Sequence, residues 1–102
     1  IGLATSLGEG LDAHWEALSK KAVNVDETTF APYVVHPMTK LSFDAQIPKK
    51  GDQRQMEAWQ RIGVYAAGLA LTDAGIAKNE VDGLVTTTIP ETGMFAPATL
   101  AE

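Results

Sequence analysis

The sequence predicts a layered α/β fold, and three observations support this prediction. Two segments show the three-to-four-residue spacing of apolar side chains that is typical of helices. A run rich in β-branched residues follows the second helical segment and predicts a strand. The second helical segment is apolar on all sides toward its end, as a helix inside a protein is. Because 102 residues with one strong strand cannot cover that helix, we expect a fold that is incomplete on its own.

The composition excludes several classes of protein. Apolar residues make up 45% of the chain and charged residues 21%, a balance that is typical of globular rather than disordered proteins. The net charge of −5 disfavours binding to nucleic acid. Because the chain has no Cys, a disulfide scaffold, a thiolate zinc site and a cysteine nucleophile are excluded within these residues. No apolar run approaches the roughly 18 residues that span a bilayer, so no membrane association is expected.

The first ten residues are expected to form a turn that leads into a helix. Three glycines occur among them, and glycine-rich stretches mark turns rather than strand interiors. Their spacing matches neither the dinucleotide-binding pattern nor the P-loop pattern. We therefore expect a plain connection between a strand and a helix, without a nucleotide site.

Residues 11–20 are predicted to form the first helix, because one apolar stripe follows the i, i+4, i+7 spacing. The stripe consists of Leu11, Trp15 and Leu18. His14 lies beside the stripe without a second His nearby, so a structural or solvated role is expected rather than catalysis. His36 lies farther along the chain and also lacks neighbours at metal-ligand spacing. No metal site is therefore expected.

Residues 22–50 show no sustained period and contain several prolines. Short strands are possible at 33–35 and 41–43. An irregular segment of this length is unusual inside a compact domain. We expect it to be either a functional excursion or a segment that packs on a part of the protein outside these residues.

A long helix is predicted over residues 53–74, with Asp52 as its N-cap and Gly75 at its end. Several small residues lie in its second half, and small residues let another backbone approach closely. They are Gly63, Ala66, Ala67, Gly68 and Ala70. We expect another element to pack hard against this face.

Residues 81–90 are predicted to form a strand that Pro90 ends. Leu84 and Val85 have the character of buried strand residues. A turn is expected at Thr92-Gly93, and another helix is expected to start near Ala96.

Two stretches of this sequence resemble β-ketoacyl-acyl-carrier-protein synthases of the thiolase-like superfamily. In the first, a glycine turn leads into a helix: Gly2-Leu3, then Ser6-Leu7-Gly8-x-Gly10-Leu11-Asp12-x-x-Trp15-Glu16-Ala17-Leu18. In the second, a buried helix ends in Asp-Ala-Gly: Asp52-Gln53-Arg54-x-Met56-Glu57-Ala58-Trp59, then Ala66 through Asp73-Ala74-Gly75. The two stretches cover roughly half of the chain. They follow each other in the order and at the separation expected of the family.

The resemblance implies a fold and a reaction. Residues 1–102 would belong to one condensing-enzyme domain with a partial thiolase-like layered fold, the amino-terminal part of a βαβαβαββ half. The reaction would be the decarboxylative Claisen condensation of an acyl thioester with malonyl-carrier protein, in fatty-acid or polyketide biosynthesis. In that family a Cys carries the acyl chain and His residues stabilise developing charge, so these groups are expected outside this chain. No cofactor is implied, and a homodimer and a cytoplasmic location are expected.

Residues 81–90 depart from the elongating synthases, which usually have a Gly-Ser-Gly-containing segment after the second strand. They are similar instead to initiating synthases and thiolase-like proteins, in which a strand ends in Thr-x-x-Pro. An enzyme that uses coenzyme A thioesters is therefore one alternative, and a non-catalytic partner subunit without the Cys is another. A small free-standing binding module is a third alternative, which the irregular segment and the apolar helix fit badly.

The resemblance also implies a docking site for the acyl carrier protein. Some relatives place basic residues just before the buried helix, and Lys49, Lys50 and Arg54 stand in matching positions. Attraction to an acidic partner would mainly raise the association rate and would weaken with salt. The alternative is that these side chains are simply the solvated start of a helix.

Overall fold

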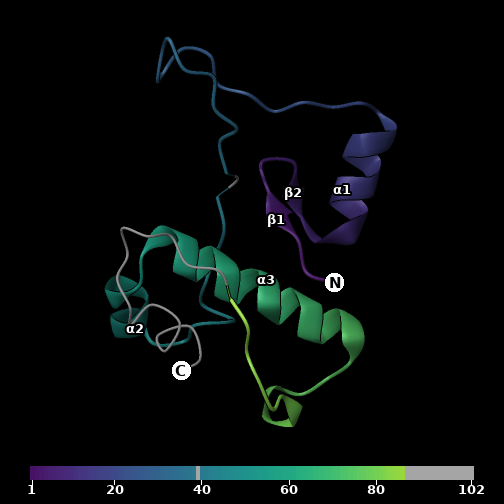
Figure 1. Cartoon of the computed structure of the whole chain (residues 1–102), viewed down its shortest axis with the longest axis vertical. Coiled ribbons are helices and arrows are strands. Elements are labelled where there is room, and N and C mark those ends of the chain that lie inside the picture. The colour runs from purple at the N-terminus through teal and green to yellow at the C-terminus, as the bar shows by residue number, and fades with distance from the viewer. Residues whose placement is uncertain (39, 87–102) are drawn as a thin grey trace.

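The computed structural model describes residues 1–38 and 40–86 (Figure 1). These residues form a small mixed helix–strand structure with three α-helices, one 3-10 helix and a two-stranded sheet. In chain order the elements are β1 (Ala4–Thr5), β2 (Gly8–Glu9), α1 (Gly10–Ser19), α2 (Lys50–Gln55), α3 (Ala58–Ala74) and the 3-10 helix η1 (Lys78–Glu80). The predicted mixture of helices and strands is therefore confirmed.

The first ten residues form a tight antiparallel hairpin. Ala4 of β1 lies opposite Glu9 of β2, and Thr5 lies opposite Gly8. Gly8 has a φ of 128° and Gly10 a φ of 82°, in the region that favours glycine. The predicted turn lies at Ser6-Leu7, but Gly8 belongs to β2 and pairs with Thr5. The expected plain connection is therefore wrong, because the segment folds back on itself as a hairpin before α1 begins.

The first helix is confirmed at Gly10–Ser19, but its predicted apolar stripe points outward. Trp15 is 74% exposed and Leu18 is 65% exposed. The buried residue of this helix is His14, which hydrogen-bonds to Thr5 of the hairpin. The hairpin contact therefore determines which face of α1 turns inward, and this contact is polar.

The predicted single helix over 53–74 is wrong at its start. The backbone is extended at Met56, and this residue separates α2 from α3. Glu57, rather than Asp52, is the N-cap of α3 and forms a capping box with Gln60. In that box the Glu57 N–H donates to Gln60 Oε1 at 2.8 Å. Gly75 ends α3 with a φ of 68°, as predicted.

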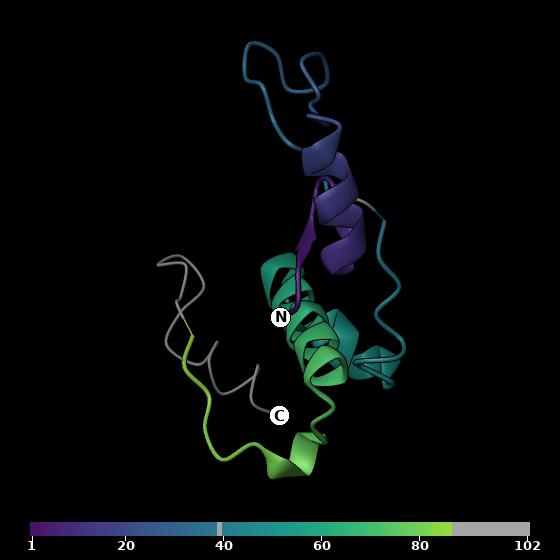
Figure 2. The same cartoon turned by 90° about the vertical axis from the view of Figure 1, so that its right-hand side faces the viewer.

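The start of the chain packs against the small-residue face of α3. Figures 1 and 2 both place the amino terminus beside this helix. A Cβ atom added to Gly2 would lie 1.8 Å from the Ala66 carbonyl oxygen and 2.7 Å from the Ala70 nitrogen. The expected close approach of another backbone is therefore confirmed.

The core of the described structure is small. Its buried apolar side chains are Ile47, Met56 and Tyr65, and the Phe43 ring meets Tyr65 edge-on at 5.9 Å between centroids. Gly63 and Ala67 of α3 are exposed. The Cα radius of gyration is 15.2 Å, whereas a compact domain of this length has about 13 Å. The helix predicted to be sandwiched is thus only partly covered by the residues that the structure describes.

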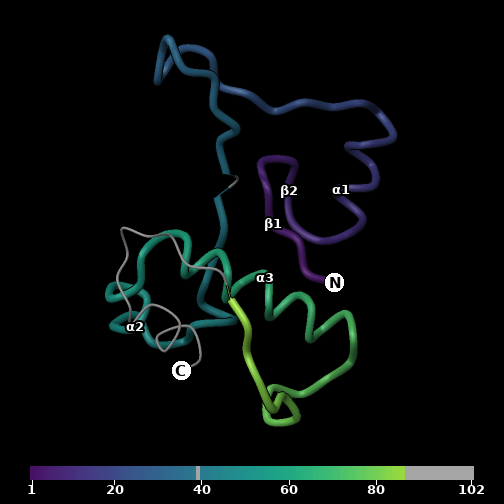
Figure 3. Tube along the Cα trace, in the orientation of Figure 1, coloured from purple at the N-terminus to yellow at the C-terminus, as the bar shows by residue number. Residues whose placement is uncertain are grey.

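Two predicted strand regions are not strands in the described structure. The long segment before α2 is irregular, as expected (Figure 3), and its only pairing in the described ranges is an isolated bridge between Asp26 and Val35. Residues 81–86 are extended without a partner strand, and Val85 is 97% exposed rather than buried. A strand needs a ladder partner, and none of the described segments supplies one. Residues 87–90, the turn at 92–93 and the helix expected near Ala96 lie outside the described residues.

None of the described helices combines the length and apolar character needed to cross a membrane.

Candidate functional site

The three basic residues predicted to bind a partner gather at α2. Lys49 immediately precedes this helix, Lys50 is its first residue and Arg54 lies in its last turn. All three side chains are exposed. Lys50 and Arg54 are four residues apart and therefore share one helix face. Together, Lys49, Lys50 and Arg54 form the basic cluster.

Lys50 is engaged by an acidic residue that the sequence pattern did not reveal. Its Nζ lies 2.5 Å from Asp44 Oδ1, and Gln53 Nε2 donates to the same oxygen at 2.9 Å. The Lys50 hydrogen bond, followed by the Gln53 hydrogen bond, lowers the pKa of Asp44. Asp44 and Lys50 are six residues apart and share no helix, so no periodic pattern predicts their contact.

Lys49 and Arg54 differ from Lys50. Neither side chain has an ion pair or hydrogen bond to any residue in the described ranges. Both remain open to solvent and can pair with anionic groups of another molecule. Such a side chain can form an ion pair with another molecule without first breaking an ion pair within this chain.

Lys49 also lines a groove of about 430 Å³ between the loop before α2 and the α3 helix. Lys78 and Asp52 are further polar residues of its lining. Apolar side chains make up much of the rest: Ile47, Pro48, Met56, Val64 and Leu71. Lys49, the member of the basic cluster in this lining, thus borders a surface that can accept an apolar group beside an anionic one.

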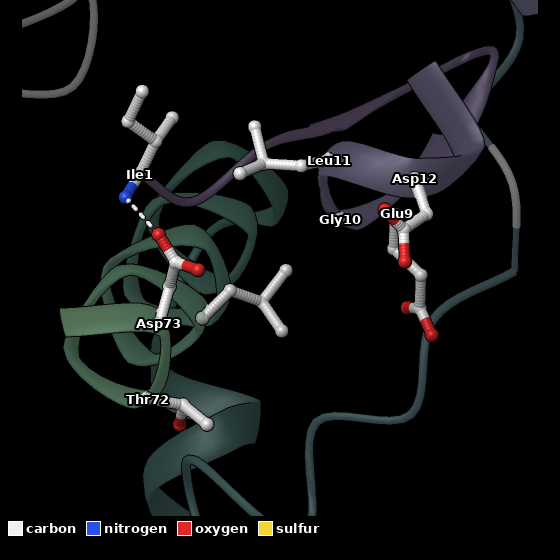
Figure 4. A pocket seen from close by; sticks show the side chains of 8 residues that line it. Ile1, Glu9, Gly10, Leu11, Asp12, Thr72 and Asp73 are labelled. Atoms are coloured by element: carbon white, nitrogen blue, oxygen red, sulfur yellow. Dashed lines mark hydrogen bonds and ion pairs between the residues drawn. The ribbon is translucent and has the colours of Figure 1, made fainter. Parts of the chain in front are cut away.

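A second hollow, of about 350 Å³, lies where β2 and the start of α1 face the end of α3 (Figure 4). Three carboxylates line it: Glu9, Asp12 and Asp73. The amino group of Ile1 pairs with Asp73 at 2.9 Å. The described residues contain no group of three or more His, Cys, Asp or Glu that could hold a metal ion. The lining of this hollow is mainly acidic, whereas the groove beside Lys49 has two lysines, Lys49 and Lys78, and one carboxylate, Asp52.

His14 has the structural role that the sequence predicted. Its Nδ1 lies 2.6 Å from the Gly10 carbonyl oxygen, which only accepts, so Nδ1 donates. In the neutral imidazole, Nε2 then accepts from the Thr5 hydroxyl at 2.7 Å, and Thr5 Oγ1 accepts from the Leu7 N–H at 3.1 Å. Nε2 thus ties the hairpin to α1, Nδ1 bonds within the first turn of α1 itself, and both ring nitrogens are engaged.

Comparison with known proteins gave no family model, no curated protein and no solved structure that matches this chain.

Proposed function

We propose that residues 1–102 form the amino-terminal part of a thiolase-like β-ketoacyl-acyl-carrier-protein synthase. The observation that carries the proposal is the contact between the two stretches that resemble this family. Gly2, from the first stretch, lies against the backbone of α3 at Ala66 and Ala70, from the second. Two separate sequence motifs that meet in space support one origin better than two chance likenesses.

The proposed reaction joins an acyl thioester to the carbanion that malonyl-carrier protein forms when it loses carbon dioxide. A thiolate nucleophile and fixed hydrogen-bond donors supply that chemistry. This chain has no Cys, and His14 is engaged in the hairpin. In this proposal the catalytic groups belong to the full-length protein outside residues 1–102, and the present chain contributes scaffold and docking surface. The chain alone is expected to release no carbon dioxide above background from acyl and malonyl thioesters.

The docking role is assigned to the basic cluster. Lys49 and Arg54 are exposed and have no partner in the described ranges, and Lys49 borders the apolar groove. An acidic acyl carrier protein would be attracted over several ångströms, with an effect that falls as salt rises. This arrangement supports the carrier protein as partner more than a nucleic acid, since the net charge of the chain is −5.

The test is titration of the protein with purified acyl carrier protein at low and high salt. The double variant Lys49→Glu with Arg54→Glu should bind about tenfold more weakly at low salt. The matched control is Lys20→Glu with Lys21→Glu, which reverses the charge of two other exposed cations and changes the net charge by the same amount. The control should bind as the wild type does. Equal losses in both variants, or no binding by the wild type, would contradict the docking role.

The alternatives are an initiating synthase that uses coenzyme A thioesters and a partner subunit without the catalytic Cys. The full-length protein would have a Cys at the nucleophile position if it is one of the enzymes. It would have another residue there if it is the partner subunit. Carbon dioxide release by the full-length protein with a coenzyme A primer, compared with a carrier-protein primer, separates the two enzymes.

A further inference from the structure

Lys50 differs from the other members of the basic cluster because a carboxylate of the same chain already occupies it. The Asp44 and Lys50 side chains remain 57% and 65% exposed in their ion pair, so another molecule can reach both. We infer that Asp44 is an internal competitor, which holds Lys50 until the carboxylates of an acidic carrier protein displace it. This inference rests on the proposed docking role of the basic cluster.

The position of Asp44 is determined by its neighbours in the fold. The preceding residue, Phe43, packs its ring against Tyr65, and the Phe43 carbonyl accepts the Ile47 N–H at 2.8 Å. This turn presents Asp44 to α2. Gln53 Nε2 then contacts both Asp44 Oδ1 at 2.9 Å and the Ile47 carbonyl oxygen at 2.7 Å.

The exposed ion pair between Asp44 and Lys50 can be replaced by a pair with another molecule at little cost to the stability of the fold. Exposed ion pairs contribute little to folding, because water and salt screen them. A partner that presents several carboxylates at once can therefore replace Asp44. A partner with few carboxylates pairs only with Lys49 and Arg54. Asp44 thus lowers affinity for every anionic partner and raises discrimination in favour of strongly acidic ones.

The decisive variant is Asp44→Asn, which removes the charge and keeps an oxygen that accepts from Gln53. Its affinity for acyl carrier protein at low salt should rise about two- to fivefold, and the gain should shrink at high salt. The matched control is Asp52→Asn, which removes one charge from α2, the helix that carries Lys50. The Asp52 side chain has no ion pair or hydrogen bond in the described ranges, so its gain should be smaller.

A double-mutant cycle with Lys50→Gln shows whether the gain depends on Lys50. In the Lys50→Gln background, Asp44→Asn should give no more than the gain seen for Asp52→Asn. Equal gains from Asp44→Asn and Asp52→Asn in the wild-type background would mean that only net charge matters, and would overturn the inference. Weaker binding by Asp44→Asn would mean that Asp44 positions Lys50 for the partner, and would overturn it as well.

The outcomes also separate this inference from the proposed function. If the wild type binds acyl carrier protein and Asp44→Asn binds no more tightly, competition is wrong and the docking role stands. If neither protein binds, the docking role is wrong and the inference falls with it.

Discussion

Tyr65 donates its phenolic hydrogen to the carboxylate of Glu9, a residue 56 positions earlier in the chain. The bond joins the middle of α3 to the end of β2, where α1 begins. It raises the pKa of Tyr65, because the hydrogen bond and the nearby negative charge both favour the protonated phenol. Together with the packing of Gly2 on α3, it holds the amino-terminal hairpin in place.

Replacing Tyr65 by Phe should lower the free energy of unfolding by about 1 kcal/mol, since the hydrogen bond is lost while the exposed Glu9 regains water. Tyr33→Phe is the control, because Tyr33 is 73% exposed. Urea denaturation followed by circular dichroism measures both variants. Equal stability of the Tyr65 and Tyr33 variants would show that the bond to Glu9 contributes nothing.

Replacing Gly2 by Ala should destabilise the protein by about 1–3 kcal/mol, because the new methyl group would overlap the α3 backbone at Ala66. Gly51→Ala is the matched control. A Cβ atom at Gly51 meets nothing within 4 Å, and Ala favours a helix over Gly. Chemical denaturation should show a loss for the first variant and none for the second. A Gly2→Ala protein as stable as the wild type would contradict the close packing of hairpin and helix.

Asp26 should titrate well below the ordinary range of an aspartate. Hydrogen bonds from Thr29 and Thr28 lower its pKa from 3.8 to about 2. Because the folded value lies below the unfolded one, the turn is fully stabilised above about pH 4 and loses this stabilisation as the pH falls through about 2. The amide shifts of Thr28 and Thr29 should follow this titration in nuclear magnetic resonance spectra. A midpoint near 3.8, or the same titration in Asp26→Asn, would refute the assignment.

Replacing Lys50 by Gln should raise the pKa of Asp44, because the hydrogen bond from Lys50 is the largest cause of its lowered value. The bond from Gln53 remains, so the return toward the ordinary range should be partial. Carboxyl carbon shifts measured against pH detect the change. Asp26 serves as the internal reference, since its own shift comes from Thr29 and Thr28. If the pKa of Asp44 is the same in the Lys50→Gln variant and the wild type, Lys50 does not contact Asp44 in solution.

Local features of the fold were predictable from sequence. Apolar spacing predicted the helix α1, although the structure turns that stripe outward, and the end of α3 follows from the left-handed backbone that Gly75 adopts. The close packing on α3 follows from small residues, which admit a backbone at Ala66 and Ala70. Each of these depends on neighbours within a few positions or on side-chain size alone.

Features that depend on distant contacts escaped prediction. The strands of the hairpin have two residues each, too few to show an alternating pattern. The outward turn of Trp15 results from the bond between His14 and Thr5, which apolar spacing does not encode. The break at Met56 had a readable signal in Glu57 and Gln60, a pair with capping-box spacing. For the basic cluster, sequence identified the cations but not Asp44, because a turn brings it to Lys50.

The outward turn of α1 also gives the chain an optical reporter. The indole of Trp15 is 74% exposed, whereas Trp59 is partly buried and donates from Nε1 to Glu57 at 3.2 Å. In a Trp59→Phe background, the remaining fluorescence comes from a ring surrounded by water. A polypeptide that binds over Trp15 would remove water from the indole and shift its fluorescence emission maximum to shorter wavelength. The emission wavelength therefore reports binding to this face of α1.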